Sequence, residues 1–294
     1  MIKLSFIGFL ATIVLFVFGI FSTRTYNIEK IEIEFENLPK SFENFKIIHI
    51  SDLHLVSWTS AELLDKSVKA INKLEADLIL ITGDLVSFKA NEILPFLDVL
   101  SDLKAQYGVY NVLGNHDYGD YVKWNNWQEM VQNMEDFESL NLQMGWNLLK
   151  DENVRVFSPD SFEYISIIGV ENWSKSRHFN HQGDIDVALQ GVDNEGFKIL
   201  LSHDPSHWEF LMENNYDIDL TLSGHTHAMQ FGANFSFFKW SPVKYISKHW
   251  HGLYLHSQNG KENYLHVSAG MGCVGFVSRV GFPPEISLIE LKIK

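Results

Sequence analysis

Clusters of aspartate, histidine and asparagine stand at five places along this chain, each directly after a short apolar run. The clusters are Asp52-Leu53-His54, Gly83-Asp84, Gly114-Asn115-His116-Asp117, His203-Asp204 and Gly224-His225-Thr226-His227. Their side chains offer the oxygen and nitrogen ligands that bind manganese, iron or zinc in proteins. Two such ions about 3.5–4 Å apart can clamp a phosphoryl group and generate a hydroxide at neutral pH. We therefore interpret the clusters as parts of one two-metal hydrolytic site.

The spacing inside the clusters suits this interpretation. Side chains repeat every two residues in an extended chain, so Asp52 and His54 are predicted to point to the same side, and likewise His225 and His227. Glycines precede three of the clusters and permit tight backbone turns where ligands must approach an ion. Asp84 supplies a single carboxylate, which can bridge two ions.

Each cluster also has a simpler interpretation. A D-x-H tripeptide is commonly a surface or capping sequence, Gly-Asp after a strand usually forms a turn, and most H-x-H tripeptides bind no metal. A chain without a metal site would need all of these simpler interpretations to hold at five strand ends together. The combination therefore favours the functional interpretation.

The apolar runs that precede the clusters have the length of buried strands. Strand-like runs cover residues 45–50, 78–82, 109–113, 165–170, 198–202 and 220–223. Helical spacing of apolar residues appears at 61–74, 92–103 and 123–140. This alternation indicates an α/β domain with mostly buried strands. Sites in such domains form outside the carboxyl ends of the strands, so we expect the five clusters to converge on one crevice.

Other patterns define the ends of the domain. Residues 31–35 alternate between apolar and polar types and predict an edge strand within a polar entry segment, residues 25–44. Apolar runs flank Asn259-Gly260 and predict a hairpin over residues 253–267. Residues 286–293 alternate and predict a final strand. No linker divides residues 45–294, which we expect to form one domain.

The N-terminal segment predicts a membrane anchor. Residues 4–21 carry no charge, and a helix of about 18 residues is near the lower limit for spanning a bilayer. The segment lacks the polar face of a core helix, and Phe21-Ser22-Thr23-Arg24 is a poor signal-peptide cleavage site. We expect residues 1–24 to form an uncleaved transmembrane helix, with a signal peptide or a soluble helix as alternatives. Positive charges flank both ends, so the charge rule assigns no side of the membrane.

The composition excludes some classes of protein. Of the 294 residues, 46% are hydrophobic and 20% charged, as in ordinary globular domains. The net charge of −14 argues against a protein that binds nucleic acid through a broad basic face, although metal ions can still attract an anionic substrate. The single cysteine, Cys273, rules out an intramolecular disulfide and is expected to pack in the core, as is His49. No feature predicts an oligomeric state.

In type, order and spacing, the five clusters resemble the motifs of the calcineurin-like metallophosphoesterase superfamily. Those motifs are D-x-H, G-D, G-N-H-[DE], a lone histidine and G-H-x-H, and the resemblance covers the chain from about Phe45 to its end. The sequences Leu-Leu-Ser-His-Asp-Pro and Ser-Gly-His-Thr-His are similar to the bacterial membrane-associated branch. The resemblance implies a four-layer α-β-β-α sandwich of two mixed sheets, here preceded by the transmembrane helix.

The resemblance also implies a role for each residue. It implies two divalent ions, of manganese, zinc or iron, and seven ligands shared between them. The ligands of the first ion would be Asp52, His54 and His227, those of the second Asn115, His203 and His225, and the bridging ligand Asp84. His116 would protonate the leaving oxygen or stabilise the transition state, with Asp117 as its orienting carboxylate.

The expected activity is hydrolysis of a phosphodiester or pyrophosphate bond by in-line attack of a hydroxide that bridges the ions. Some members of the branch act on UDP-diacylglucosamine in lipid A synthesis, and the predicted anchor favours a lipid or another phosphorylated molecule at a membrane. Arg279 is a candidate for binding substrate phosphate, with a surface salt bridge as the alternative. The competing functions are a catalytically silent scaffold, which the complete ligand set disfavours, and a nuclease, which the net charge disfavours.

An aromatic stretch with interleaved lysines covers residues 231–254. It is either a loop that packs on the core or a rim that contacts lipid, because tryptophan and tyrosine favour membrane interfaces and lysine favours anionic lipids.

Overall fold

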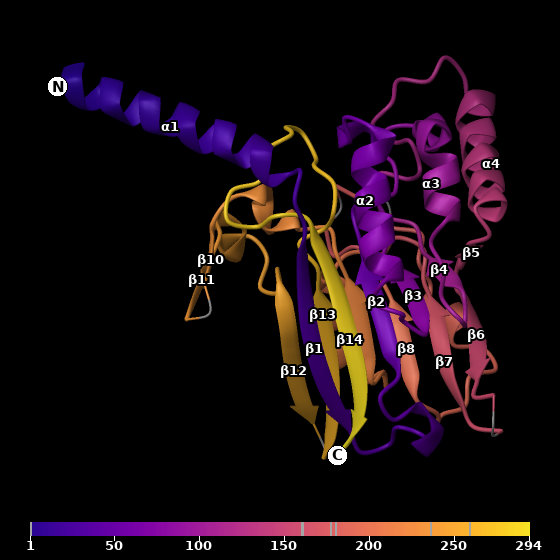
Figure 1. The fold of residues 1–294 in the computed structure, drawn as a ribbon. Helices are drawn as coiled ribbons and strands as arrows, with labels where there is room; N and C mark the ends of the chain where they lie inside the picture. Colours follow the sequence, from indigo (N-terminus) through magenta and orange to yellow (C-terminus); the bar gives the residue numbers. More distant parts are fainter. Residues whose placement is uncertain (1, 160–161, 177, 180, 236, 259) are drawn as a thin grey trace.

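Two six-stranded mixed sheets pack face to face in this computed structural model (Figure 1). Helices cover both outer faces. The structure describes residues 2–159, 162–176, 178–179, 181–235, 237–258 and 260–294, with side chains for all of these except 2–8, 11 and 258.

The first sheet has the strand order β1-β14-β2-β3-β4-β5. Its strands are β1 (Asn27–Phe35), β14 (Glu285–Ile293), β2 (Lys46–Ile50), β3 (Leu78–Ile81), β4 (Val109–Asn111) and β5 (Asn147–Leu148). Strands β2 to β5 are parallel, and β14 runs parallel to β1 but antiparallel to β2. The predicted edge strand is therefore present as β1. It pairs with β14 along all 9 of its residues, so the entry segment belongs to the sheet of the domain.

The second sheet has the order β12-β13-β9-β8-β7-β6. Its strands are β12 (Gly252–Gln258), β13 (Lys261–Val267), β9 (Leu220–Ser223), β8 (Lys198–Leu201), β7 (Tyr164–Gly169) and β6 (Glu152–Phe157). Strands β7, β8, β9 and β13 are parallel, and β6 and β12 are antiparallel edges. The predicted hairpin is confirmed as β12–β13, although its Asn259 lies outside the described residues. A separate small hairpin joins β10 (Ala233–Phe235) to β11 (Phe238–Trp240).

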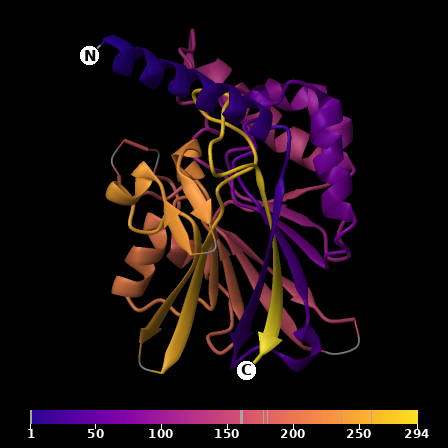
Figure 2. The same cartoon turned by 60° about the vertical axis from the view of Figure 1, so that its left-hand side comes forward.

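Helices complete the four layers (Figure 2). On the outer face of the first sheet lie α2 (Ala61–Asn72), α3 (Leu97–Ser101) and α4 (Trp127–Gln143), and on that of the second lie α5 (Ile185–Ala188) and α6 (Ser206–Glu213). Side chains alternate along each strand, so Ile48 and Ile50 pack against the helices while Ile47 faces the other sheet. The predicted α-β-β-α sandwich of mixed sheets is confirmed.

One predicted helix is divided. Residues 92–103 form a 3-10 helix over Ala90–Phe96 and then the short α3. Pro95 lies inside this segment, and its missing N–H and fixed φ disfavour a continuous α-helix.

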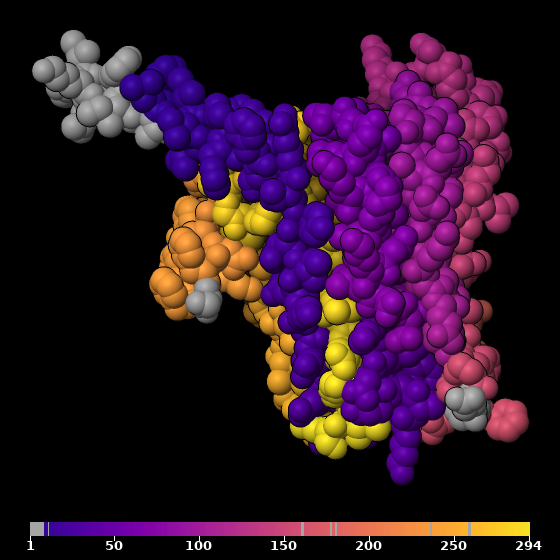
Figure 3. All heavy atoms as spheres, in the orientation of Figure 1, coloured from indigo at the N-terminus to yellow at the C-terminus, as the bar shows by residue number. Residues whose placement is uncertain are grey.

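The N-terminal helix α1 (Ile2–Ser22) projects away from the sandwich (Figures 1 and 3). Its end contacts the loop before β14, where Arg279 N–H donates to Gly19 O at 3.0 Å and Ser278 Oγ donates to Phe16 O at 3.1 Å. Within the residues described above, no helix combines the length and apolarity of a membrane span. The helix is therefore present, whereas its insertion into a membrane stays a prediction.

Candidate metal centre

All seven predicted ligands lie at the carboxyl ends of strands, where the two sheets meet. Strand β2 precedes Asp52 and His54, β3 precedes Asp84, and β4 precedes Asn115. In the second sheet, β8 precedes His203, and β9 precedes His225 and His227. Both sheets therefore contribute to one site, as the alternation of strands and clusters predicted.

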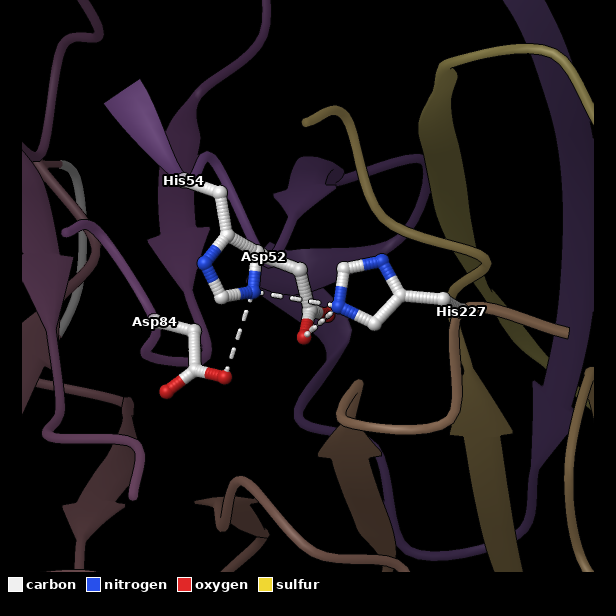
Figure 4. A group of neighbouring side chains, drawn as sticks. All are labelled: Asp52, His54, Asp84 and His227. Atoms are coloured by element: carbon white, nitrogen blue, oxygen red, sulfur yellow. Dashed lines mark hydrogen bonds and ion pairs between the residues drawn. The ribbon is translucent and has the colours of Figure 1, made fainter. Parts of the chain in front are cut away.

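Four of these residues form a first group. One ligand atom each from Asp52, His54, Asp84 and His227 lies within 4.8 Å of the others (Figure 4). The Nε2 atoms of His54 and His227 are 3.1 Å apart. Nε2 of His227 lies 3.2 Å from Asp52 Oδ1, and Nε2 of His54 lies 3.5 Å from Asp84 Oδ2. Nitrogen lone pairs and carboxylate oxygens thus converge on one point, as in a cation site.

The second group shares Asp84 with the first. Ligand atoms of Asp84, His203 and His225 lie within 4.8 Å of one another, and His203 Nε2 is 3.2 Å from Asp84 Oδ2. Asn115 donates from Nδ2 to the Tyr121 hydroxyl at 2.8 Å, whereas its buried Oδ1 has no hydrogen-bond partner among the described residues. A carbonyl oxygen left free in this way suits a metal ligand. The shared carboxylate has the position that a bridging ligand needs.

The backbone at the site differs from the extended form that the D-x-H spacing predicted. Five of the seven residues have a positive φ, namely Asp52 (53°), His54 (39°), Asp84 (54°), His225 (69°) and His227 (51°). Left-handed backbone breaks the period of two, so the extended form predicted for these pairs was wrong, although Asp52 and His54 do contribute to the same group. His225 and His227 accordingly serve different groups. Such residues each cost on the order of 1–3 kcal/mol and cluster at functional sites.

Two glycines allow the carboxylates their positions. A Cβ at Gly114 would lie 2.2 Å from Asp84 Oδ1, and one at Gly224 would lie 2.2 Å from Asp52 Oδ2. Backbone N–H groups then hold the carboxylates. His116 N–H donates to Asp84 Oδ1 at 2.9 Å, and His225 N–H donates to Asp52 Oδ1 at 3.0 Å. These glycines therefore leave room for the carboxylates, a role in addition to the tight turns that the sequence predicted.

The electrostatics of the site favour a cation. Burial alone would raise the carboxyl pKa values, but His227 lowers the pKa of Asp52 and His203 lowers the pKa of Asp84, each below its usual range. Burial lowers the pKa of His227 to about 4, against the opposing effect of Asp52, which leaves its imidazole neutral. Although burial opposes it, Asp84 raises the pKa of His203 to about 10. The negative charge that holds a proton on His203 would equally attract a metal ion.

His116 lies half-buried at the edge of a cavity beside these groups. Its Nδ1 is 2.9 Å from the carbonyl oxygen of Ser87, and its ring stacks on Tyr121 with centroids 4.2 Å apart. The Ser87 carbonyl therefore fixes the ring, and Nε2 is the nitrogen left for a substrate. Sequence reasoning missed both Ser87 and Tyr121, because neither belongs to a recognisable motif.

Asp117 has a different position from the one expected. Its buried carboxylate accepts the backbone N–H of Asp84 at 2.8 Å, of Gly114 at 2.8 Å and of Val86 at 3.1 Å. Burial and the charge of Asp84 raise the pKa of Asp117 to about 7. This geometry corrects the predicted role: Asp117 positions the backbone around Asp84 and does not orient the His116 ring.

Arg279 is fully buried, which corrects the prediction that it binds substrate phosphate. Its guanidinium donates to the carbonyl oxygens of Gly272 at 2.9 Å, Ala269 at 2.9 Å and Phe282 at 3.2 Å. Its NH2 nitrogen lies 3.2 Å from Nδ1 of His227, on the side of the ring that faces away from the first group. Arg279 therefore supports a predicted ligand from behind.

The cavity in front of the site has a volume of about 600 Å³. Its lining includes the predicted site residues Asp84, Asn115, His116, His225 and His227, and also Lys175, Lys248, Met229 and Ile246. A phosphoryl group at the metal ligands would thus leave room for a larger substituent between cationic and apolar side chains.

Comparison with known proteins agrees with the site. The family model for calcineurin-like phosphoesterases matches residues 45–229. A zebrafish (Danio rerio) protein called "Transmembrane protein with metallophosphoesterase domain" is 30% identical over 97% of this chain and 62% of its own length. An uncharacterized metallophosphoesterase of Helicobacter pylori (strain ATCC 700392 / 26695) is 32% identical over 86% of this chain and 61% of its own length. The chain thus spans about three fifths of these relatives.

Another relative matches along most of both chains. The uncharacterized metallophosphoesterase YkoQ of Bacillus subtilis is 27% identical over 92% of this chain and 92% of its own length. Among solved structures, the NAD nucleotidase of Haemophilus influenzae has a TM-score of 0.48 at 17% identity, covering 78% of this chain and 45% of that one.

Proposed function

Because the chain belongs to the calcineurin-like phosphoesterase family, we propose that it is a two-metal phosphoesterase that hydrolyses a phosphodiester or pyrophosphate bond. The observation that carries the proposal is the pair of ligand groups that share Asp84. A shared carboxylate suits two ions held close enough to act on one phosphoryl group.

Each of the two ligand groups that share Asp84 would hold one metal ion. Asp52, His54 and His227 would hold one divalent ion, Asn115, His203 and His225 the other, and Asp84 both. When bound, two ions of manganese, zinc or iron would offset the charge that develops on the phosphoryl oxygens and make water a nucleophile at neutral pH.

His116 is the proposed general acid. The Ser87 carbonyl accepts from Nδ1–H, so Nε2 can carry a second proton toward the cavity and release it to the leaving oxygen. Burial lowers the pKa of His116, opposed by the charge of Asp84, and a lower pKa makes the protonated ring a stronger acid.

We further propose that α1 holds the enzyme at a membrane. Described side chains of α1 expose apolar surface, with Phe9, Val14 and Phe18 exposed at 62%, 65% and 60%. Apolar surface of this extent is unfavourable in water and favourable in lipid. The word "Transmembrane" in the name of the zebrafish relative also supports this proposal.

The proposed substrate is a lipid, of which UDP-diacylglucosamine is one example. Exposed apolar residues gather on the hairpin β10–β11 and the segment after it, on the same side of the molecule as α1 (Figure 1). They are Phe235, Phe237, Phe238, Tyr245 and Ile246. Because Ile246 also lines the cavity, an acyl chain could extend from the metal ligands to this surface. Lys244 and Lys248 lie in the same segment and suit anionic headgroups.

The activity is tested with the full chain in detergent, stripped of metal and resupplied with manganese, zinc or iron. Hydrolysis of bis-p-nitrophenyl phosphate and p-nitrophenyl phosphate would be measured for the wild type and for Asp84→Asn. Metal-restored turnover that disappears in the variant supports the two-metal enzyme. Two bound metals without turnover on these diesters, monoesters or lipid pyrophosphates would favour the silent scaffold.

The lipid proposal has its own test. The double variant Phe237→Ser/Tyr245→Ser should slow hydrolysis of a lipid pyrophosphate in vesicles and leave the soluble diester unaffected. Phe162→Ser serves as the matched control, since Phe162 is 99% exposed and lies in the loop between β6 and β7. Equal losses on both substrates would count against a lipid-binding surface.

A further inference from the structure

A second group of histidine and glutamate lies between the two sheets, apart from the ligands described above. It consists of His49 on β2, His251 directly before β12, His266 on β13, Glu29 on β1 and Glu285 on β14. Four of the five are buried, and Glu29 is half-buried. One ligand atom each from Glu29, His266 and Glu285 lies within 4.8 Å of the others. The proposed catalysis uses none of these residues.

His266 has one ring nitrogen paired and the other free. Its Nδ1 lies 2.9 Å from Nδ1 of His49, whereas its Nε2 is buried and lacks a hydrogen-bond partner within the described part of the chain. The buried Oε2 of Glu29 also lacks a hydrogen-bond partner there. Longer ion pairs join Glu29 to His251 at 3.8 Å and to Lys239 at 3.9 Å. Buried polar atoms without hydrogen bonds are uncommon and costly, so the free Nε2 of His266 indicates a missing interaction.

One proton is shared between Nδ1 of His49 and Nδ1 of His266, and either histidine can be its donor. If His49 donates to His266, then Nε2 of His266 carries a buried N–H that reaches no acceptor at hydrogen-bonding distance among the described residues. If His266 donates, His49 can donate in turn from Nε2 to the Thr82 hydroxyl at 2.9 Å. The buried Nε2 of His266 then keeps a free lone pair, and a cation bound by His266 and the two carboxylates would satisfy it.

Glu285 is held in one position. Its Oε2 accepts from His251 Nε2 at 2.7 Å, and its Oε1 accepts the backbone N–H of Ala269 at 3.3 Å and the Ser287 hydroxyl at 3.2 Å. Metal-binding carboxylates and imidazoles commonly have such outer hydrogen bonds.

Burial would raise the pKa of Glu285, but His251 lowers it to about 2, while burial lowers the pKa of His266 to about 4. Burial and the charge of Glu285 raise the pKa of Glu29, and a cation between the two carboxylates would oppose that shift. An ionised carboxylate and a neutral imidazole are the forms that bind metal.

We propose that Glu29, His266 and Glu285 bind a third divalent cation. One imidazole and two carboxylates suit zinc, manganese or ferrous iron, since the nitrogen disfavours a purely hard cation such as calcium. The ligands come from β1 and β14 in the first sheet and β13 in the second, so the cation would join the two sheets. The inference rests on these contacts and does not depend on the proposed function.

The proposal is tested by counting metal ions. The full chain, stripped and then equilibrated with zinc, should bind three ions per chain by elemental analysis. Glu29→Gln and His266→Gln should each bind two and keep turnover on bis-p-nitrophenyl phosphate, which also reports that the variants are folded. Glu32→Gln, at an exposed position on the same strand, is the matched control and should bind three.

Two results would overturn the proposal: a wild type that binds only two ions, or variants that retain the third. Either result would leave turnover and the two catalytic ions intact. Failure of the proposed function would instead appear as metal binding without turnover, so the two failures are distinguishable.

Discussion

The two histidine–carboxylate groups of this molecule use the same residue types on different parts of the backbone. The ligands around Asp84 follow the ends of strands, and most of them have left-handed backbone. His49 and His266, by contrast, lie within strands, in ordinary ladder positions that pair with their neighbours. The first group opens into a cavity, whereas His266 and Glu285 of the second are buried between the sheets and only Glu29 is half-buried.

The position of each group on the backbone limits what the group can do. Loops at strand ends can place several ligands and leave room for a substrate, which suits catalysis. Side chains between two sheets hold fixed positions and admit no large molecule, which suits a structural ion. The following predictions test that division, from the largest expected effect to the smallest.

Replacing His116 should affect turnover but not metal binding. His116→Ala should lower kcat on a diester with a poor leaving group by about 10²–10⁴-fold, because the leaving oxygen loses its proton donor. The loss on bis-p-nitrophenyl phosphate should be smaller, since that leaving group needs less protonation, and the number of bound metals should not change. Equal losses on both substrates would contradict the acid role.

Arg279 joins His227, in the group around Asp84, to backbone carbonyl oxygens such as that of Ala269. Arg279→Met should lower the free energy of unfolding by about 3 kcal/mol, because buried carbonyl oxygens lose their donor, and should weaken metal binding at His227. Urea unfolding and elemental analysis measure the two effects. Arg155→Met is the control, since this exposed arginine donates to the carbonyl oxygen of Gly191 and lies over the ring of Tyr164. An unchanged free energy of unfolding in Arg279→Met would contradict the role of Arg279 in supporting this part of the fold.

Gly114 tests the dependence of the catalytic group on its backbone. In Gly114→Ala the new methyl must displace the Asp84 carboxylate, and a shift near 1 Å can cost about 10²-fold in turnover. Gly196→Ala is the matched control, because neither glycine has a positive φ and the nearest atom to a Cβ at Gly196 lies 3.4 Å away, at ordinary contact distance. The expected readout is kcat/KM, and full activity in Gly114→Ala would show that Asp84 tolerates movement.

His207 is a buried histidine that belongs to neither group. Its ring stacks on Trp173 with centroids 4.5 Å apart, its Nδ1 lies 2.8 Å from Ser202 Oγ, and burial lowers its pKa to about 3. The unfolded state therefore binds a proton that the folded state does not between pH of about 6.5 and 3.

Stability should accordingly fall as the pH drops through this window, by up to about 1.4 kcal/mol per pH unit from His207. Urea unfolding from pH 7 to pH 5 measures the slope, and His207→Phe should flatten it. The same slope in wild type and variant would assign the acid sensitivity to other groups.

Sequence patterns predicted which residues lie together in the candidate site better than they predicted the surroundings of those residues. The ligands stand in short motifs after apolar runs, so their order and convergence could be read directly. Their supports come from distant parts of the chain: His203 Nδ1, for example, is paired with the carbonyl oxygen of Thr82, 121 residues away. The left-handed backbone at Asp52 and the burial of Arg279 depend on tertiary contacts of this kind, which no local pattern records.

The fold shows the same limits. Long periodic segments such as 61–74 predicted α2 correctly, and the four layers followed from the family resemblance. Strands β5 and β6 were missed: Asn147–Leu148 has only 2 residues, and Glu152–Phe157 is an edge with little burial. The group around His266 gave no signal either, because single polar residues within strands resemble ordinary packed positions.

The place of β14 between β1 and β2 affects how the protein is made. Synthesis begins at the N-terminus, so both neighbouring strands leave the ribosome long before β14 exists. In the sheet as described, β1 pairs with β14 alone, so β1 has no strand partner until nearly the whole chain has been synthesised. Unpaired strand edges can pair with other chains. We therefore expect this protein to be most prone to aggregation while β1 is unpaired during translation. A nascent chain that stops before Glu285 would keep that exposure permanently.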